Sequence, residues 1–437
     1  MIKTFAVTNY KSIKDRAELI MTKSKLAGTS KMNYFDLPGT KTTLLKTAIL
    51  YGGNASGKSA FLGAFKAIEY LVNYSGNFKV NERIGPYEPY KLDRKNQTLP
   101  TTFEISFFSQ GIEYELKTSI TQRRIEKEEL YYYPNGVRSL LYSRLPEKEI
   151  KYGESYKGSK KIIERALQNN QLFLSKAAEN NPESLKAPYL FFTEGLDVYP
   201  FLQFFEEDSL SRKYIKRIAE DSNSNFARKF YKLICALDTG ISKITVVEND
   251  VTNELLLKIP EDIRNGFKER YKYDVKTIHS VFEGNNIVGE EKFNINEEST
   301  GTKSLFIYAG VILDTLEKGS VLIIDEMEKN MHPLITGYLI KLFHNPLTNP
   351  NNSQLIISTH DTSQLSGDQF RRDQVWLIEK DDHGASMLFR CSEIKGLRLN
   401  TPIDKWYLSG RLGGTPVIMD QDFLIEMQNQ NEINERG

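Results

Sequence analysis

The sequence predicts an α/β fold in which a mixed sheet is flanked by helices, with an antiparallel β part near the N-terminus and an inserted helical lobe. Three observations indicate this class. A glycine-rich turn joins an apolar, β-prone run to an amphipathic helix at residues 46–73. A second apolar run, Val321–Ile324, is continuous, as in a parallel strand that is buried on both faces. Three β-prone runs between residues 102 and 133 have the spacing of an antiparallel meander.

The glycine-rich turn has the pattern G-x-x-x-x-G-K-S, and it stands between a strand and a helix, the context that gives the pattern its meaning. Gly52 and Gly57 allow backbone angles that bring N–H groups onto phosphate oxygens. Lys58 is long enough to reach the β- and γ-phosphates, and Ser59 can offer its hydroxyl to Mg²⁺. The alternative is a chance turn between a strand and a helix. The residues predicted to bind ATP here are Gly52, Gly53, Asn54, Ala55, Ser56, Gly57, Lys58, Ser59 and Ala60.

The length and composition indicate a globular protein of more than one unit. The 437 residues exceed the usual size of a single hydrophobic core. A net charge of +1 provides no global positive field that would demand nucleic acid. Cys235 and Cys391 are the only cysteines, which favours a reducing compartment, so we expect a cytoplasmic protein. No signal peptide and no membrane span are predicted. The expected segments are the N-terminal half of a nucleotide-binding head at 1–135, a mainly helical insertion at 136–240, the C-terminal half at 241–420 and a polar tail at 421–437.

The remaining elements are placed by their hydrophobic periodicity. Residues 2–7 and 17–21 have the pattern of a hairpin, and residues 22–45 have that of a polar loop. Longer runs with helical or strand periodicity follow. The predicted meander strands are Thr102–Phe108, Glu113–Ile120 and Arg124–Tyr133, the predicted helices are Lys160–Ala178, Asn223–Leu237 and Phe306–Leu316, and the later strands are Ile241–Val247, Glu254–Leu257, Ile278–Phe282 and Gln354–Ser358.

Basic residues gather in the insertion. They are Arg212, Lys213, Lys216 and Arg217, followed by Arg228, Lys229 and Lys232. One interpretation is a surface that faces nucleic acid or another partner. The other is a solvated helix face whose charge is balanced by acidic neighbours. Those neighbours are Glu206, Glu207, Asp208, Glu220 and Asp221.

Two acidic residues follow the buried run Val321–Ile324. Asp325 stands at the carboxyl end of this strand, where a carboxylate that coordinates Mg²⁺ belongs in a phosphate-loop ATPase. Glu326 is placed to polarise a water for attack on the γ-phosphate. The alternative is that both carboxylates only cap the next helix.

A histidine ends the next predicted strand, Gln354–Ser358. His360 stands one strand beyond the acidic pair, so it could reach the γ-phosphate and sense or polarise it. A lone histidine after a strand is also compatible with a structural role. The predicted catalytic residues are Lys58, Glu326 and His360, and the predicted metal ligands are Ser59 and Asp325.

A second helix start suited to phosphate precedes the acidic pair. Residues 296–305 read NEESTGTKSL and lead into a helix, with Ser299 and Gly301 at its N-terminus. Because the chain already has one phosphate loop, this helix start is predicted to bind the ATP of a partner subunit. The alternative is an ordinary helix cap. The predicted contacts are Ser299, Thr300, Gly301 and Lys303.

Together these stretches resemble the ABC-type ATPases of the SMC, RecF, RecN and OLD group. The stretches that carry the resemblance are GGNASGKS, ESTGTKS, LIIDEMEKNMHP and STHD. The start FAVTNYKSI, the DEMEKNMHP stretch with His332 and Pro333, and the late YLSGRLGGTP are more similar to one branch. That branch is the RloA-like and abortive-infection ATPases of bacterial and phage-defence loci, which include the ATPase of the PARIS system. The resemblance covers about residues 1–135 and 290–420.

The resemblance implies a head-to-tail dimer, or a higher oligomer, that buries two ATP–Mg²⁺ between its subunits. It also implies a role for each matched residue. Gly52–Ser59 would be the Walker A loop, Ser299, Thr300, Gly301 and Lys303 the signature, Asp325 the Walker B acid, Glu326 the catalytic base, residues 328–332 the dimer-facing loop and His360 the switch histidine.

The sequence departs from related patterns in several places. The signature lacks the leucine and paired glycines of transporter ATPases, which is usual in this branch. The glutamine that touches Mg²⁺ in such proteins has two candidates, Gln110 and Gln122. The insertion is too short for an SMC coiled coil, and we expect no room after His360 for the TOPRIM domain of OLD nucleases. Asp381 and Asp382 are interpreted as a hairpin turn rather than as a metal site.

The function predicted from these residues and this resemblance is ATP hydrolysis by a sensor or regulatory subunit of a bacterial anti-phage, abortive-infection system. It would gate a separately encoded effector, such as a TOPRIM- or RloB-like nuclease, and cut no nucleic acid itself. One alternative is a DNA-binding clamp of the RecF or SMC kind. Another is a toxin–antitoxin or scaffold component whose hydrolysis matters little.

Overall fold

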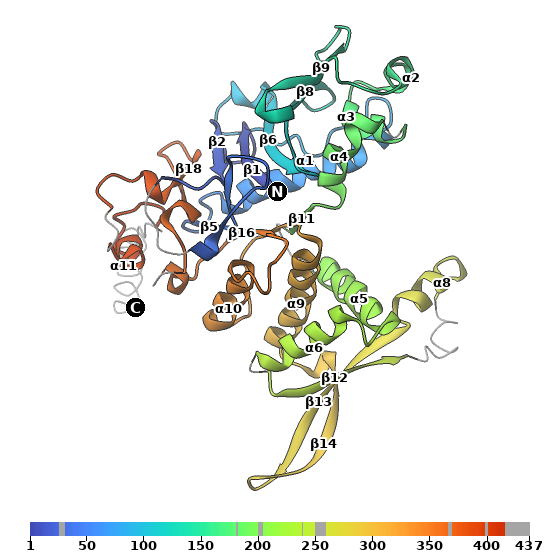
Figure 1. Ribbon diagram of the computed structural model, residues 1–437, viewed down its shortest axis with the longest axis vertical. Helices are drawn as coiled ribbons and strands as arrows, with labels where there is room; N and C mark the ends of the chain where they lie inside the picture. The colour runs from blue at the N-terminus through green and yellow to red at the C-terminus, as the bar shows by residue number, and fades with distance from the viewer. Residues whose placement is uncertain are drawn as a thin grey trace, which may run out of the picture.

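The computed structural model describes residues 1–25, 31–180, 182–199, 204–237, 239–249, 259–365, 369–397 and 401–415. Two larger sheets lie in the upper half of the molecule, and a lobe of helices with a small sheet extends below them (Figure 1). Within the described ranges, no helix is long and apolar enough to cross a membrane.

The central sheet has six strands in the order β11-β15-β16-β5-β17-β18. Its first five strands pair in parallel, and β18 pairs antiparallel with β17. Because parallel strands end at one edge of a sheet, the residues that follow β5, β15 and β16 converge there. The strands are β11 (Leu196–Tyr199), β15 (Val321–Ile324), β16 (Gln354–Ser358), β5 (Thr47–Tyr51), β17 (Val375–Lys380) and β18 (Ser386–Arg390).

The second sheet is antiparallel, with the order β10-β9-β8-β7-β6-β1-β2. It confirms the predicted N-terminal hairpin and the meander. Residues 22–45 differ from the predicted loop, since Leu44 and Leu45 are buried and two short strands, β3 (Tyr34–Asp36) and β4 (Thr43–Leu45), pair there. The strands of the larger sheet are β1 (Ile2–Thr8), β2 (Ala17–Ile20), β6 (Thr101–Ser109), β7 (Ile112–Ile120), β8 (Ile125–Tyr132), β9 (Ser139–Arg144) and β10 (Lys151–Tyr152).

Helix α1 (Lys58–Tyr74) shares one hydrophobic core with both sheets. The ring of Phe5 on β1 stacks on Phe65 of α1, with centroids 3.7 Å apart, and meets Phe61 edge-on at 5.7 Å. Trp376 of β17 belongs to the same core. The start of α1 is therefore fixed by contacts from both sheets.

A second core covers the other face of the central sheet. Successive residues of β5 point to opposite faces of the sheet, so Leu50 lies in the first core and Tyr51 in the second. The small sheet β12-β13-β14 joins this part, and its β13–β14 hairpin projects at the bottom of Figure 1. The other elements here are α5 (Phe204–Glu220), α6 (Asn225–Ala236), β12 (Ile241–Glu248), α8 (Glu261–Arg270), β13 (Tyr273–Glu283), β14 (Asn286–Asn294), α9 (Thr300–Lys318), α10 (Pro333–His344) and α11 (Ile403–Leu408).

Within the described part of residues 136–240, helices predominate, as the sequence predicted, but the segment also supplies strands to both larger sheets. Strands β9 and β10 extend the antiparallel sheet, and β11 pairs with β15 at the edge of the central sheet, because an open sheet edge offers unpaired backbone groups. The helices divide between the two cores. Those of the first core are α2 (Lys160–Ala166), α3 (Phe173–Ala178) and α4 (Glu183–Thr193).

Other predicted elements fare differently. The helix at Asn223–Leu237 is confirmed by α6, whereas the run Lys160–Ala178 is broken into α2 and α3. The buried carboxylate of Glu128 causes part of this break, because it accepts hydrogen bonds from the backbone N–H groups of Phe173 and Leu174 (2.6 and 2.9 Å). The strand predicted at Glu254–Leu257 and the polar tail at 421–437 lie outside the described residues. The α/β class with a mixed sheet and an antiparallel N-terminal part is confirmed.

Candidate active site

The predicted phosphate loop joins β5 to α1 at the carboxyl edge of the central sheet. Gly57 has a φ of 116°, and a Cβ built there would lie 2.2 Å from Oγ of Ser386. A Cβ at Gly52 would lie 2.5 Å from the carbonyl oxygen of Ile378. Both positions therefore require glycine. No side chain caps α1, so the N–H groups of its first turn are free to donate to an anion.

Lys58 is 5% exposed and lies over the loop. Its Nζ donates hydrogen bonds to the carbonyl oxygens of Gly52 (2.8 Å) and Gly53 (3.1 Å). Burial lowers the pKa of Lys58, while the carboxylates of Asp325 and Glu326 oppose this shift. A phosphate bound in the loop could replace these two neutral carbonyls as the acceptor for the ammonium group. Because phosphate is negatively charged, it is the stronger hydrogen-bond acceptor.

Two serines far apart in the sequence support the loop. The Oγ of Ser386 donates a hydrogen bond to the carbonyl of Ser56 (2.6 Å) and lies 2.8 Å from Oγ of Ser12. The backbone N–H of Ser386 donates to the carbonyl of Ser12 (2.7 Å). Ser12 follows β1 and Ser386 begins β18, so both sheets hold the loop in place.

Asp325 directly follows β15 and is 8% exposed. Its carboxylate accepts a hydrogen bond from the hydroxyl of Ser358, and the hydroxyl of Ser59 lies close enough to lower its pKa. Burial raises the pKa of Asp325, while these two hydroxyls and Lys58 act in the opposite direction. A hydroxyl and a carboxylate are hard oxygen donors, as Mg²⁺ prefers, so the pair fits this ion. The described part of the chain has no group of three or more His, Cys, Asp or Glu that could hold a metal, so phosphate and water oxygens would have to complete the coordination.

Glu326 and His360 lie at the same edge of the sheet. Glu326 is exposed, has a φ of 50°, and donates its backbone N–H to Oγ of Ser358 (3.0 Å). The backbone N–H of His360 donates to Oε1 of Glu328 (2.6 Å). Oε2 of Glu328 is shielded from solvent and accepts no hydrogen bond from the described residues. The structure thus brings together the acidic pair, His360 and Glu328, a third carboxylate that the sequence predicted only as part of the dimer-facing loop.

The predicted signature forms the start of α9. Oγ of Ser299 accepts a hydrogen bond from the backbone N–H of Thr302 (3.1 Å), which is an ordinary N-cap. A Cβ at Gly301 would lie 2.7 Å from the carbonyl oxygen of Asn330, so the helix start packs on the 328–332 loop of its own chain. Nζ of Lys303 donates to the carbonyl of Asn296 (2.7 Å). Across the described ranges, no hydrogen bond or ion pair joins Ser299, Thr300, Gly301 or Lys303 to the phosphate loop.

Three further candidates are placed by the structure. Gln110 follows β6 at the end of that strand next to Met1, where β1 begins. The phosphate loop is linked through Ser386 to Ser12, beyond the other end of β1. Gln110 and the loop therefore lie at opposite ends of β1. Gln122 lies in the turn between β7 and β8. Asp381 is in the β17–β18 hairpin turn, as predicted, and its carboxylate accepts the backbone N–H groups of residues 383 and 385 (2.9 and 2.8 Å).

The C-terminal stretch also reaches the phosphate loop. The hydroxyl of Tyr407 donates to the carbonyl of Gly414 (3.0 Å), and the N–H of Gly414 donates to Oε2 of Glu379 (2.9 Å). A Cβ at Gly414, where φ is 70°, would lie 3.7 Å from Cα of Gly52. The glycine pair in YLSGRLGGTP was the available signal, but its position against the loop was not predictable from the sequence.

Comparisons with known proteins place this site in a wider group. A family profile described as "AAA domain, putative AbiEii toxin, Type IV TA system" matches residues 48–366, which is well over half of the chain. No curated protein matches the sequence. Among solved structures, the chain is similar to an SmcHead bound to the C-winged helix domain of ScpA, with 13% identity, coverage of 92% of this chain and 99% of that one, and a TM-score of 0.41.

Two other SMC structures give similar values. The SMC head domain from Thermotoga maritima has 13% identity, coverage of 89% and 98%, and a TM-score of 0.38. The Smc head domain with an extended coiled coil bound to the C-terminal domain of ScpA, derived from Pyrococcus furiosus, has 12% identity, coverage of 94% and 99%, and a TM-score of 0.39. At such values the similarity does not identify a ligand or partner of this chain.

Proposed function

Because this chain belongs to the AAA-domain family named for the AbiEii toxin of type IV toxin–antitoxin systems, and so carries an AAA-type ATPase domain, we propose that it hydrolyses ATP with Mg²⁺ at the loop after β5. The observation that carries the proposal is the meeting of three groups at one sheet edge. Lys58 lies on the loop, and the hydroxyl of Ser59 lies beside the carboxylate of Asp325, close enough to lower its pKa.

The proposed chemistry relies on positioning and charge. Backbone N–H groups of Gly52–Ala60 and the ammonium group of Lys58 hold the phosphates of ATP. Ser59 and Asp325 hold Mg²⁺, which when bound neutralises charge on the phosphate oxygens. Glu326 orients and deprotonates the attacking water, and the exposed imidazole of His360 donates to the γ-phosphate.

The signature is proposed to act between two subunits. Ser299 and Thr300 are exposed at the start of α9, so the helix end can receive the γ-phosphate of a nucleotide held by another copy. The packing of Gly301 on the 328–332 loop makes both segments part of one surface. Head-to-tail closure of two chains would then complete two composite ATP sites.

The biological role that we propose is regulatory. Opening and closing of the dimer would hold or release a separately encoded effector, such as a TOPRIM- or RloB-like nuclease, in a cytoplasmic anti-phage system. Such a switch requires the effector to bind the two nucleotide states with different affinity. The family description, which names a toxin of a type IV system, supports this direction. A DNA clamp of the RecF or SMC kind is the alternative, and the cluster of basic residues on α5 is the feature that favours it.

The assignment is tested with Lys58→Ala. This change removes the only side-chain cation of the loop, so ATP affinity should fall at least about tenfold, with loss of magnesium-dependent hydrolysis. Binding is measured with a fluorescent ATP analogue and hydrolysis by phosphate release. Lys66→Ala on the outer face of α1 is the matched control. Wild-type binding and turnover by Lys58→Ala would contradict the assignment.

A further inference from the structure

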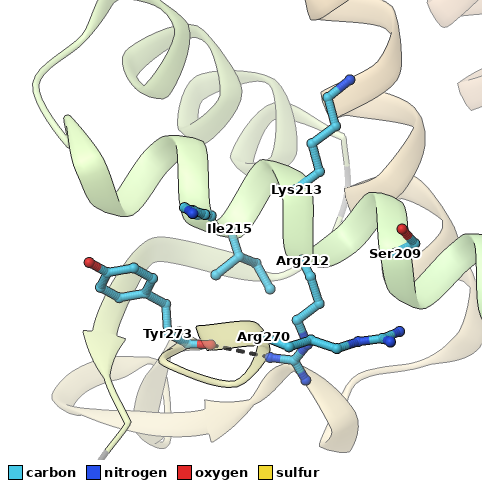
Figure 2. Close-up of a pocket in the computed structure, with 7 residues that line it drawn as sticks. Ser209, Arg212, Lys213, Ile215, Arg270 and Tyr273 are labelled. Carbon is cyan, nitrogen blue, oxygen red and sulfur yellow. Dashed lines mark hydrogen bonds between the residues drawn. The ribbon is translucent and has the colours of Figure 1, made fainter. Parts of the chain in front are cut away.

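A basic cavity of about 250 Å³ lies between α5, α8 and the start of β13, outside the candidate active site. Its polar lining residues are Ser209, Arg212, Lys213 and Lys216 of α5, Arg270 of α8 and Tyr273. Figure 2 shows the guanidinium groups of Arg212 and Arg270 side by side below α5, while Lys213 points away from them. Two guanidinium groups in contact repel each other unless an anion lies between or beside them.

A single carboxylate serves both arginines. Oδ2 of Asp208 is 2.5 Å from Nη2 of Arg270, and its Oδ1 is 3.5 Å from Nε of Arg212. Among the described residues, Lys216 pairs with Glu220 at a distance of 3.9 Å. The cavity therefore presents more positive charge than Asp208 neutralises, which favours an anionic ligand.

Two contacts hold the side chain of Arg212 in place, and its buried Nε donor makes no hydrogen bond with the described residues. Its Nη1 donates to the carbonyl of Tyr273 (3.2 Å), and its guanidinium lies over the ring of Tyr271, 4.5 Å from the centroid. Its Nε is shielded from solvent and makes no hydrogen bond within the described residues. The carboxylate of Asp208 lies 3.5 Å from this Nε, so a ligand oxygen that made a hydrogen bond with the buried N–H would gain more than at a solvated cation.

We propose that this cavity binds a phosphate group, supplied either by the backbone of a nucleic acid or by a free phosphoryl compound. The planar guanidinium groups of Arg212 and Arg270 match the tetrahedral array of phosphate oxygens, and each can donate two hydrogen bonds. This proposal gives a binding role to the basic residues of α5, which have no role in the proposed ATPase site. The sequence allowed either a partner-binding surface or a charge-balanced helix face for these residues. Both hold in part, because some of the cations pair with acidic residues and others line the cavity.

The same helix connects the cavity to the signature helix α9. Lys213 and Arg217 form ion pairs with Asp314 of α9 (3.1 and 2.8 Å). A Cβ at Gly310 of α9 would lie 2.3 Å from the ring of Tyr214, so the two helices are in direct contact. A phosphate that shifts α5 would also shift α9. This coupling rests on the proposed function of the signature, whereas phosphate binding itself does not.

The binding test uses the full chain without ATP. Fluorescence anisotropy follows a labelled DNA duplex and a labelled single-stranded RNA, and calorimetry follows inorganic pyrophosphate in a Lys58→Ala background, so that the phosphate loop does not report. The test variant is Arg212→Gln with Arg270→Gln. The matched control is Arg228→Gln with Lys268→Gln, which removes the same charge from exposed positions outside the cavity.

Affinity for at least one probe should fall about tenfold or more in the test variant and change less than about threefold in the control. If nucleic acid is the source, the slope of log affinity against log salt for the duplex should decrease by about 0.9, since one phosphate contact is lost. Loss of pyrophosphate binding with unchanged oligonucleotide binding would assign a free phosphoryl ligand. No binding by the wild type, or equal loss in test and control variants, would overturn the proposal.

Two measurements keep these outcomes distinct. Thermal unfolding checks that the double variant folds, and the single change Arg270→Gln, at a side chain that is 46% exposed, serves if it does not. The bound probe should also change wild-type ATP hydrolysis at least about twofold and leave the test variant unaffected. Binding without this change would overturn the coupling alone, and a wild type without hydrolysis would contradict the proposed function while the binding result stood.

Discussion

At the scale of single residues, Ser358 connects the two carboxylates that we propose act on ATP and Mg²⁺ to the sheet. Its hydroxyl donates to Asp325 and accepts the backbone N–H of Glu326 (3.0 Å). Ser358→Ala should remove the hydrogen bond that orients Asp325. We therefore expect ATP turnover at limiting magnesium to fall about tenfold, which corresponds to the free energy of one to two hydrogen bonds. The magnesium dependence of hydrolysis measures this. A curve identical to the wild type would show that Ser358 does not orient the metal ligand.

Some residues of the site could be predicted from the sequence and others could not. Lys58, Ser59 and Asp325 each stand at a fixed distance from a buried strand, so local pattern was sufficient. Ser12 and Ser386 are common residues with no such pattern. Their contact with the loop arises only when β1 and β18 come together, and a single sequence carries no direct signal for that pairing.

At the scale of elements, we propose that the start of α9 decides whether two chains close. Gly301→Asp should block closure, because its carboxylate repels the γ-phosphate and any Cβ approaches the carbonyl of Asn330. Hydrolysis should fall at least about tenfold. Gly289→Asp is the matched control, since a Cβ there meets no atom within 4 Å.

Mixing the signature variant with Lys58→Ala gives a second outcome at this scale. A mixed dimer retains one composite site with both halves intact, so part of the lost hydrolysis should return. Absence of recovery together with normal closure of Gly301→Asp in light scattering would show that α9 does not contact a partner's nucleotide.

The end of α10 makes stability depend on pH. Nε2 of His344 lies 2.9 Å from Oγ1 of Thr47 on β5, and burial lowers the pKa of His344 to about 3. The pKa of histidine in an unfolded chain is about 6.5. The unfolded state therefore gains a proton below about pH 6.5 while the folded state does not, and stability falls as the pH drops from there toward about 3.

His344→Gln cannot take up this proton. Its Tm should therefore fall less than the wild-type Tm between about pH 7 and pH 5, whereas His383→Gln, at an exposed position, should follow the wild type. Calorimetry or circular dichroism measures both. Identical acid dependence in all three proteins would show that His344 is not the responsible group.

Among the elements, long runs with clear periodicity were predictable and short ones were not. Strand β15 and helix α6 follow directly from their patterns. Strand β11, of four residues, is fixed by its pairing with β15 rather than by its own sequence. For the same reason the prediction of a mainly helical insertion included neither its strands nor the division of its helices between the two cores.

At the scale of the whole molecule, the proposed ATP site is the place where both sheets and the C-terminal stretch meet. The loop is held by Ser12 and Ser386, and Gly414 lies against Gly52. Nucleotide binding can therefore be transmitted to several surfaces. We expect that the protein alone cuts neither DNA nor RNA, and that it protects bacteria from phage only together with a neighbouring gene.

Plaque assays with and without the neighbouring gene measure this dependence. Full protection by this chain alone would contradict the regulatory role. Nuclease activity that survives purification and is lost on changing Asp381 and Asp382 would contradict it as well. The hairpin-turn geometry of Asp381 argues against the second result.

The most direct test of the central claim is the turnover of Glu326→Gln. The change keeps size and hydrogen bonding but removes the base, so ATP should still bind and promote dimers in light scattering, while hydrolysis falls about a hundredfold or more. Glu328→Gln, whose carboxylate receives the N–H of His360, is the comparison and should lose less activity. Turnover of Glu326→Gln at the wild-type rate, with the loss appearing in Glu328→Gln instead, would contradict the account and move the base to Glu328.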